Sequence, residues 1–167
     1  MNKKLYIAYG SNLNLNQMES RCPTAKLYGV GTINGFELQF KGAPECAFAT
    51  IGEKNNSSVP VAVWELQNRD ERRLDIYEGY PKHYYKKDIV VTVNDEELTA
   101  MVYIMNPKMD YGMPSSYYYN VVKQGYEDCG LDTSVLEQAL KDSTAKYLES
   151  QDDETEDEGV SFGTMGM

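Results

Sequence analysis

Apolar and polar side chains alternate over much of the first two-thirds of the chain, a pattern typical of half-buried β-strands. In residues 4–9, Leu5, Ile7 and Tyr9 occupy every second position. The same pattern predicts further strands at 26–33, 35–41, 46–51, 59–66, 86–93 and 98–105. Asn34-Gly35 and the polar residues 94–97 predict hairpin turns. Short strands with hairpin links favour an antiparallel or mixed sheet curled into a small barrel over repeated βαβ units.

Four helices are predicted between and after these strands. The first covers residues 14–21 and ends at Cys22-Pro23. A second begins at Asn68–Glu71, which has the form of a capping box, runs through Tyr77, and is ended by Gly79 and Pro81. Two more are predicted at 115–128 and 132–148, with Asp132 as the candidate N-cap. The predicted fold class is therefore α+β, a small mixed or antiparallel β-barrel with flanking helices.

Acidic residues are concentrated near the C-terminus. Seven of them lie in residues 149–158, and no basic residue follows Lys146. When those seven are set aside, the formal net charge of −10 becomes −3 for residues 1–148. We therefore predict one domain at residues 1–149 and a disordered acidic tail at 150–167. The mildly acidic domain has no basic stripe, which argues against nucleic-acid binding.

The scarce residue types exclude several kinds of site. His83 is the only histidine, and it lies in a polar stretch that predicts exposure. The three cysteines, Cys22, Cys46 and Cys129, include no close pair, so neither a zinc site of ordinary spacing nor a disulfide framework is expected. No apolar run has the length of a membrane span, and no export signal precedes the first strand. A cytoplasmic protein without metal or membrane association is expected.

Glu78 is the most informative single position. It follows Leu74 by four residues, which places both side chains on the same face of the predicted helix. A carboxylate on the inward face would be partly desolvated, and its pKa would rise. A fold without a suitable histidine can provide a general base in this way. The alternative is a surface glutamate in the last turn of a frayed helix.

Tyr9-Gly10-Ser11-Asn12 follows the first strand. If Gly10 takes a positive φ, the following backbone amides can converge on a negatively polarised oxygen; the alternative is an ordinary turn. The chain also has 14 tyrosines against four phenylalanines, which suits a polar pocket with flat aromatic walls. Tyr117, Tyr118 and Tyr119 start a predicted helix and must point in different directions.

Together these segments resemble the γ-glutamylcyclotransferase, or AIG2-like, family. Residues 5–13 resemble its N-terminal glycine loop, and residues 74–81 resemble the segment with its catalytic glutamate. Arg21-Cys22-Pro23 and residues 35–40 follow in the expected order, and residues 114–118 and 125–131 resemble the C-terminal helical segment of the γ-glutamyl dipeptide branch. The resemblance covers about residues 4 to 131 and excludes the acidic tail.

The resemblance implies an enzyme that needs neither metal nor cofactor. Its substrate would be a γ-glutamyl amino acid, whose α-amine attacks its own γ-carbonyl and releases 5-oxoproline and the free amino acid. Glu78 corresponds to the general acid/base. Either Tyr84 or Tyr85 has the spacing of a further family tyrosine, and Tyr84 is preferred. The implied substrate-binding residues are Tyr6, Ile7, Ala8, Tyr9, Gly10, Ser11, Asn12, Tyr84 and Tyr118.

Three alternatives stay open at this stage. The same chemistry could act on γ-glutamylamines, glutathione or a γ-glutamyl-protected biosynthetic intermediate. A non-catalytic small-molecule-binding module could retain the cavity, although such a module has no chemical need for a base at Glu78. The acidic tail could recruit the domain to a basic partner. The sequence leaves the oligomeric state open.

Overall fold

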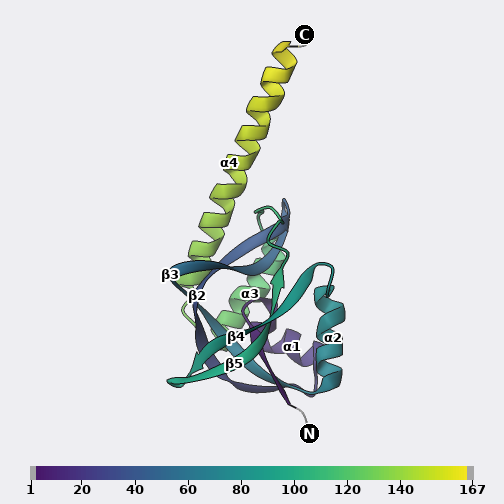
Figure 1. Cartoon of the computed structure of the whole chain (residues 1–167), viewed down its shortest axis with the longest axis vertical. Helices are drawn as coiled ribbons and strands as arrows, with labels where there is room; N and C mark the ends of the chain where they lie inside the picture. The colour runs from purple at the N-terminus through teal and green to yellow at the C-terminus, as the bar shows by residue number, and fades with distance from the viewer. Residues whose placement is uncertain (1–2, 165–167) are drawn as a thin grey trace.

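A closed β-barrel forms the body of the molecule (Figure 1). The computed structural model describes the backbone of residues 3–164 and the side chains of residues 3–152. Around the barrel the strand order is β1-β3-β2-β4-β5. The strands are β1 (Lys4–Ala8), β2 (Lys26–Ala43), β3 (Cys46–Leu66), β4 (Tyr84–Val93) and β5 (Glu96–Met105). The prediction of a small mixed barrel with flanking helices is confirmed.

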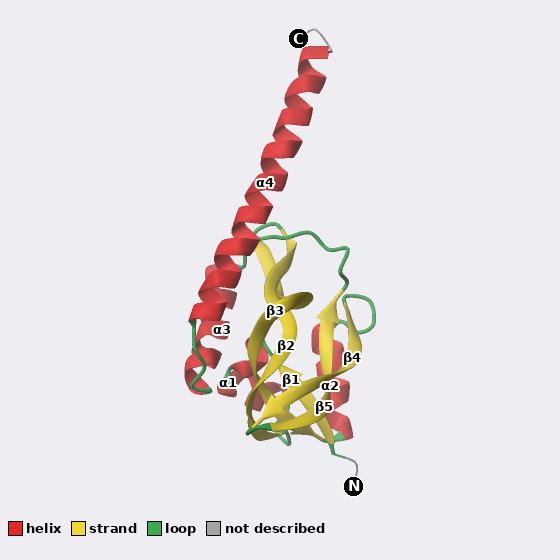
Figure 2. Cartoon of the chain, turned by 60° about the vertical axis from the view of Figure 1, so that its left-hand side comes forward, coloured by secondary structure: helices red, strands yellow, loops and turns green. Residues whose placement is uncertain are grey.

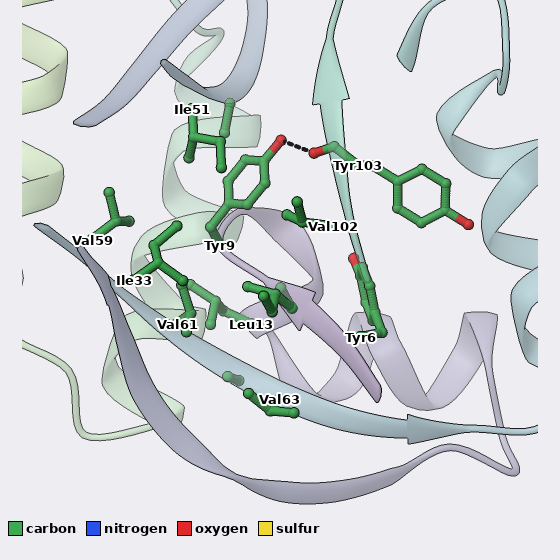
Figure 3. Close-up of a cluster of buried hydrophobic side chains, with 14 of the residues drawn as sticks. Tyr6, Tyr9, Leu13, Ile33, Ile51, Val59, Val61, Val63, Val102 and Tyr103 are labelled. Atoms are coloured by element: carbon green, nitrogen blue, oxygen red, sulfur yellow. Dashed lines mark hydrogen bonds between the residues drawn. The ribbon is translucent and has the colours of Figure 1, made fainter. Parts of the chain in front are cut away.

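Strand β1 makes the sheet mixed and closes it. Ile7 pairs with Val63 of β3 in antiparallel register and with Val102 of β5 in parallel register. Apolar side chains from β1, β2 and β3 fill the interior, where Ile33, Val59 and Val61 cluster beside Tyr9 (Figure 3). The chain leaves the barrel directly after Ala8, so the residues that follow β1 lie against this packed core.

The prediction of a hairpin at Asn34-Gly35 was wrong. β2 is one strand of 18 residues, and β3 is one strand of 21 residues. Gly35 takes a φ of 81°, but here it forms a bulge where the β2–β3 register shifts between Asn34 and Phe36. A glycine with positive φ suits a bulge as well as a turn, and the paired strand β3 runs past it on the other side.

The turn between β2 and β3 lies instead at Pro44-Glu45, because Ala43 pairs with Cys46. The predicted hairpin at residues 94–97 is confirmed as a tight turn between β4 and β5. Asn94 and Asp95 there have φ values of 50° and 64°, as a two-residue hairpin turn requires.

Two short helical segments follow β1: η1 (Ser11–Leu13) and α1 (Leu15–Arg21). The side chain of Asn14 caps α1 by accepting from the Gln17 N–H at 3.1 Å. Helix α2 (Asn68–Glu78) begins one residue earlier than expected from its capping box. Its N-cap is Gln67, whose N–H donates to the buried Asp70 carboxylate at 2.9 Å.

Helices α3 (Ser116–Asp128) and α4 (Ser134–Thr164) complete the fold (Figure 2). α4 packs against the barrel through Leu136 and Ser143, whose hydroxyl accepts from the Phe40 N–H at 2.9 Å. Beyond the body it projects as a single helix and is longer than the predicted 132–148. Disorder of residues 150–167 stays a prediction, and 165–167 lie outside the described residues. Among the described helices, none has the length and apolar character of a membrane span.

Candidate active site

One end of the barrel opens into a cavity of about 670 Å³, within the usual range for small-molecule sites. Its walls come from the segment after β1, the C-terminal end of α2, the first residues of β3, the end of β5 and α3. The predicted site residues that line it are Tyr6, Ile7, Tyr9, Gly10, Ser11, Asn12, Glu78, Tyr84 and Tyr118. Residues from four separate parts of the sequence therefore meet in one cavity.

Glu78 is the last residue of α2 and faces this cavity. The helix stops there because Gly79 takes the left-handed conformation, with φ 67°, while the His83 ring occupies the space beside it. Burial raises the pKa of Glu78 to about 7, and the positive charge of Arg21 opposes that rise. Among the described residues, none donates a hydrogen bond to the Glu78 carboxylate, so the carboxylate is available to a ligand.

Gly10 does not take the positive φ that the sequence suggested. Its φ is −125°, and glycine is needed here for space: a Cβ would lie 3.1 Å from the Ala49 Cβ and 3.3 Å from the Tyr118 hydroxyl. The N–H groups of Gly10, Ser11 and Asn12 donate no hydrogen bond within the described chain. These amides therefore have no partner in the described chain, while their binding of a substrate oxygen stays a prediction.

Asn12 is fixed from three directions. The Arg21 guanidinium donates to its side-chain oxygen, and its amide nitrogen donates to the Tyr6 hydroxyl at 2.9 Å. The Trp64 indole N–H donates to the Asn12 carbonyl at 3.2 Å. Arg21 also lies over the Tyr77 ring, 3.7 Å from its centre. This network holds the loop after β1 against α1 and α2.

The tyrosine hydroxyls of the cavity fall into two groups. Tyr9 donates to the Tyr103 carbonyl at 2.6 Å (Figure 3), and Tyr84 donates to the Ala49 carbonyl at 2.9 Å, so both brace the barrel. Tyr6 and Tyr118 instead accept protein hydrogen bonds, from Asn12 and from the Ala49 N–H. The hydroxyl protons of Tyr6 and Tyr118 therefore remain available for donation to a ligand. Burial, reinforced by the Glu78 charge, raises the pKa of Tyr6 and of Tyr118, which keeps both hydroxyls protonated.

The structure separates some residues that the sequence could not. Tyr84 faces the cavity, whereas Tyr85 lines a second, smaller cavity of about 250 Å³. Ala8 does not reach the main cavity: it is buried in the sheet, where it pairs with Ala62. Tyr117, Tyr118 and Tyr119 do point in different directions, and Tyr117 is 74% exposed.

Other residues in the cavity or beside it were not predicted as site residues from the sequence. Tyr77 is adjacent to Glu78, and the Ser11 and Tyr77 hydroxyls lie 3.1 Å apart. Arg21 lies in a segment that resembles the family. Its position beside the loop after β1 becomes clear only from its hydrogen bond to Asn12 in the structure. Further lining residues come from segments in which the local sequence does not indicate a site: Cys46, Phe48, Lys82, Met105, Asn106 and Met109.

Metal-ligating side chains are sparse in the cavity, where the lining residues of the His, Cys, Asp and Glu types are Cys46, Glu78 and His83. In the part of the chain that the structure describes, no group of three or more His, Cys, Asp or Glu side chains could hold a metal ion. The three cysteines are free, and Cys22 is buried while Cys46 is exposed. His83 is exposed, as predicted.

At one end of a small mixed barrel, the cavity brings together a desolvated carboxylate, unpaired backbone amides and two hydroxyls with free protons, an arrangement chemically capable of proton transfer and oxyanion binding. Comparison with known proteins gives the family. The family model described as γ-glutamyl cyclotransferase, AIG2-like, matches residues 6–121. The chain belongs to this family.

Individual relatives agree with that assignment. The γ-glutamylcyclotransferase of Bos taurus is 33% identical over 138 residues, covering 76% of this chain and 72% of the relative. The Homo sapiens γ-glutamylcyclotransferase is 26% identical over 162 residues, covering 92% of this chain and 86% of the relative. A solved γ-glutamyl cyclotransferase structure, 25% identical, superposes with a TM-score of 0.75 over 83% of this chain and 86% of that chain. The chain is an enzyme of this type.

Proposed function

We propose that this enzyme converts γ-glutamyl amino acids to 5-oxoproline and the free amino acid, with Glu78 as general acid and base. The observation that carries the proposal is the Glu78 carboxylate itself: it lines the cavity, burial raises its pKa to about 7, and no described residue donates to it. Such a group can accept a proton near neutral pH and return it. The free cysteines support a reducing, cytoplasmic location.

The proposed reaction begins with transfer of a proton from the substrate α-ammonium to the Glu78 carboxylate. The amine nitrogen then attacks the γ-carbonyl carbon, which closes a five-membered ring and leaves a tetrahedral oxyanion. On collapse the bond between the γ-carbon and the leaving nitrogen breaks. That nitrogen takes the proton held by Glu78 and the surplus proton of the ring nitrogen, and it departs as an ammonium ion.

The raised pKa of Glu78 makes the first step accessible. A reference glutamate and an α-amine differ by about 3.7 pKa units, roughly 5 kcal/mol against proton transfer. With the pKa of Glu78 at about 7, the gap narrows to about 1 unit, or ~1.4 kcal/mol. Burial also favours the transfer because it converts two desolvated charges into two neutral groups.

The loop after β1 supports the later steps. The free N–H groups of Gly10, Ser11 and Asn12 can stabilise the oxyanion, with each donor contributing on the order of 3 kcal/mol. The hydroxyls of Tyr6 and Tyr118 can donate to substrate oxygens. Since the cyclisation is unimolecular, much of the rate enhancement comes from holding the substrate in a reactive conformation.

The test is 5-oxoproline release from a panel of γ-glutamyl dipeptides, γ-glutamylamines and glutathione. The proposal predicts turnover of dipeptides, detected by chromatography of 5-oxoproline together with the released amino acid. Turnover of γ-glutamylamines alone, or of glutathione alone, would support the proposed reaction but would change the proposed substrate. Binding of dipeptides without any 5-oxoproline would contradict the proposal and favour a binding module.

A further inference from the structure

The mouth of the cavity carries one isolated cation. Lys82 is the only lysine or arginine among the lining residues, and Glu78 is the only acidic one. In the described chain, the Lys82 ammonium makes neither an ion pair nor a hydrogen bond. It lies in the turn that links Glu78 to β4, next to His83, whose N–H donates to the Gly79 carbonyl at 2.8 Å.

An apolar wall lies beside this cation. It consists of Phe48 and Cys46 from the start of β3, Met105 from the end of β5, and Met109 from the loop that follows. Phe48 is 46% exposed and Met109 is 42% exposed, so this side of the cavity presents large apolar side chains to solvent. The cation-bearing turn and the wall meet where the Asn106 N–H donates to the His83 carbonyl at 3.3 Å.

Backbone hydrogen bonds hold the wall in place. The Gly42 N–H donates to the Asp110 carbonyl at 2.9 Å, and the Met113 N–H donates to the Pro44 carbonyl at 2.8 Å. These bonds tie the loop after β5 to the β2–β3 turn. The apolar surface is therefore formed before any ligand arrives, which lowers the entropy lost on binding.

We propose that the Lys82 ammonium and the apolar wall (Cys46, Phe48, Met105, Met109) together form the subsite for the leaving group, so that the preferred substrates are γ-glutamyl amino acids with an apolar side chain and a free carboxylate. This inference rests on the function proposed above. An amino acid carries its carboxylate and its side chain on one carbon, so it needs a cation and an apolar surface close together. The cavity mouth supplies both, and an amine without a carboxylate leaves Lys82 unpaired.

The chain places this subsite next to the chemistry. Glu78 returns a proton to the leaving nitrogen, and the leaving carboxylate is only two bonds from that nitrogen. Lys82 is four residues from Glu78, across the turn that begins at Gly79, and its long side chain can span the remaining distance. In this proposal, the Lys82 ammonium pairs with the leaving carboxylate while Glu78 protonates the leaving nitrogen.

A matched pair of substrates tests the cation. γ-Glutamyl-methionine and γ-glutamyl-3-(methylthio)propylamine differ only in the leaving carboxylate. The wild type should favour the dipeptide in kcat/KM, and Lys82→Met should raise KM for the dipeptide roughly fivefold while KM for the amine stays unchanged. Lys108→Met is the control, since Lys108 is an exposed lysine of the neighbouring loop that does not line the cavity.

A second variant tests the apolar wall. Met109→Ser should raise KM roughly threefold for both methylthio substrates and leave γ-glutamyl-glycine unchanged. Equal wild-type rates on the matched pair, or a Lys82→Met variant that keeps the wild-type preference, would overturn the subsite while leaving the reaction intact. Absence of 5-oxoproline from every substrate would instead refute the proposed function, and the subsite with it.

Discussion

At Glu78, burial and the Arg21 guanidinium act on the pKa in opposite directions, and burial dominates. The proposed mechanism needs an ionised Glu78 and a protonated substrate α-amine, so kcat/KM should fall about tenfold per pH unit below roughly pH 7 and should fall again above the pKa of the substrate amine, about 8. The midpoint on the acid side of this profile belongs to Glu78. Arg21→Met removes the charge that stabilises the carboxylate, so the midpoint of the pH profile should move to higher pH.

Arg21→Lys separates charge from geometry in this measurement. Lysine keeps the positive charge but loses the planar contact with Tyr77 and the paired donation to Gln17 and Asn12. The pH midpoint should stay near that of the wild type in this variant, even if its rate falls. A midpoint in Arg21→Met at or below the wild-type value would contradict the role assigned to Arg21.

The same burial makes Glu78 a cost to stability. Its folded pKa of about 7 lies above the unfolded value of 4.5, so the native state loses stability as the pH rises between the two. Glu78→Gln should therefore increase the free energy of unfolding at pH 8 by about 1–3 kcal/mol, a range reduced for partial solvent contact, and should change little at pH 4. Urea unfolding at both pH values measures this.

Glu19→Gln provides the matched control, because Glu19 is exposed on α1 and lies outside the cavity. It should change the free energy of unfolding by less than about 0.5 kcal/mol at either pH. A Glu78→Gln variant no more stable than the wild type at pH 8 would show that the carboxylate is well solvated, and it would contradict a pKa raised by burial.

Some site residues follow from local pattern, and others do not. Glu78 could be predicted because its spacing from Leu74 is a property of one helix. Lys82 and Met109 could not be predicted, because they are brought to the same cavity by long-range contacts such as the hydrogen bond between residues 106 and 83. Gly10 illustrates a third case: the sequence indicated a special position, but the need is the space taken by Ala49 and Tyr118 rather than a positive φ.

Among the elements, individual strand segments could be predicted from the sequence, but whether neighbouring segments form one continuous strand could not. The strand segments predicted from alternation lie within β1 to β5, except that the first was extended one residue too far, to Tyr9. The sequence could not show that 26–33 and 35–41 are one strand, because Asn34-Gly35 suits a bulge and a hairpin turn equally. Only the partner strand decides between them, and that pairing is a long-range contact.

The packing of α3 on η1 depends on one glycine. A Cβ at Gly125 would lie 2.6 Å from the Asn14 nitrogen and 2.7 Å from the Leu13 Cβ. Gly125→Ala should therefore destabilise the protein by about 2 kcal/mol, although alanine normally stabilises a helix by about 1 kcal/mol. It should also raise KM, because η1 carries Ser11 and Asn12. Asn120→Ala, at an exposed position of the same helix, is the control for helix propensity.

That control should be neutral or slightly stabilising in a thermal unfolding experiment. If Gly125→Ala unfolds at the same temperature as Asn120→Ala, then η1 can move away from α3 without loss of stability. The loop after β1 would then be held by contacts outside α3, such as those of Asn12 with Arg21, Trp64 and Tyr6.

Over the whole molecule, α4 divides into an anchored part and an extension. Its buried anchors, Leu136, Ala139 and Ser143, lie in the first third of the helix. Removing residues 153–167 deletes five acidic side chains and changes the formal net charge from −10 to −5. We expect unchanged kcat/KM and an unchanged midpoint of thermal unfolding, because the deleted part lies beyond these anchors. Retained activity with lost binding to a basic partner would instead support recruitment by the acidic segment.

In the proposed cyclisation, Glu78 moves the proton and 5-oxoproline is released. The most direct measurement compares 5-oxoproline release from a γ-glutamyl dipeptide by the wild type, Glu78→Gln and Glu19→Gln at pH 8, with folding checked by circular dichroism. Glu78→Gln is expected to fold but to lose turnover by about a thousandfold or more, whereas Glu19→Gln should keep the wild-type turnover. A folded Glu78→Gln enzyme that works within tenfold of the wild-type rate would contradict the claim.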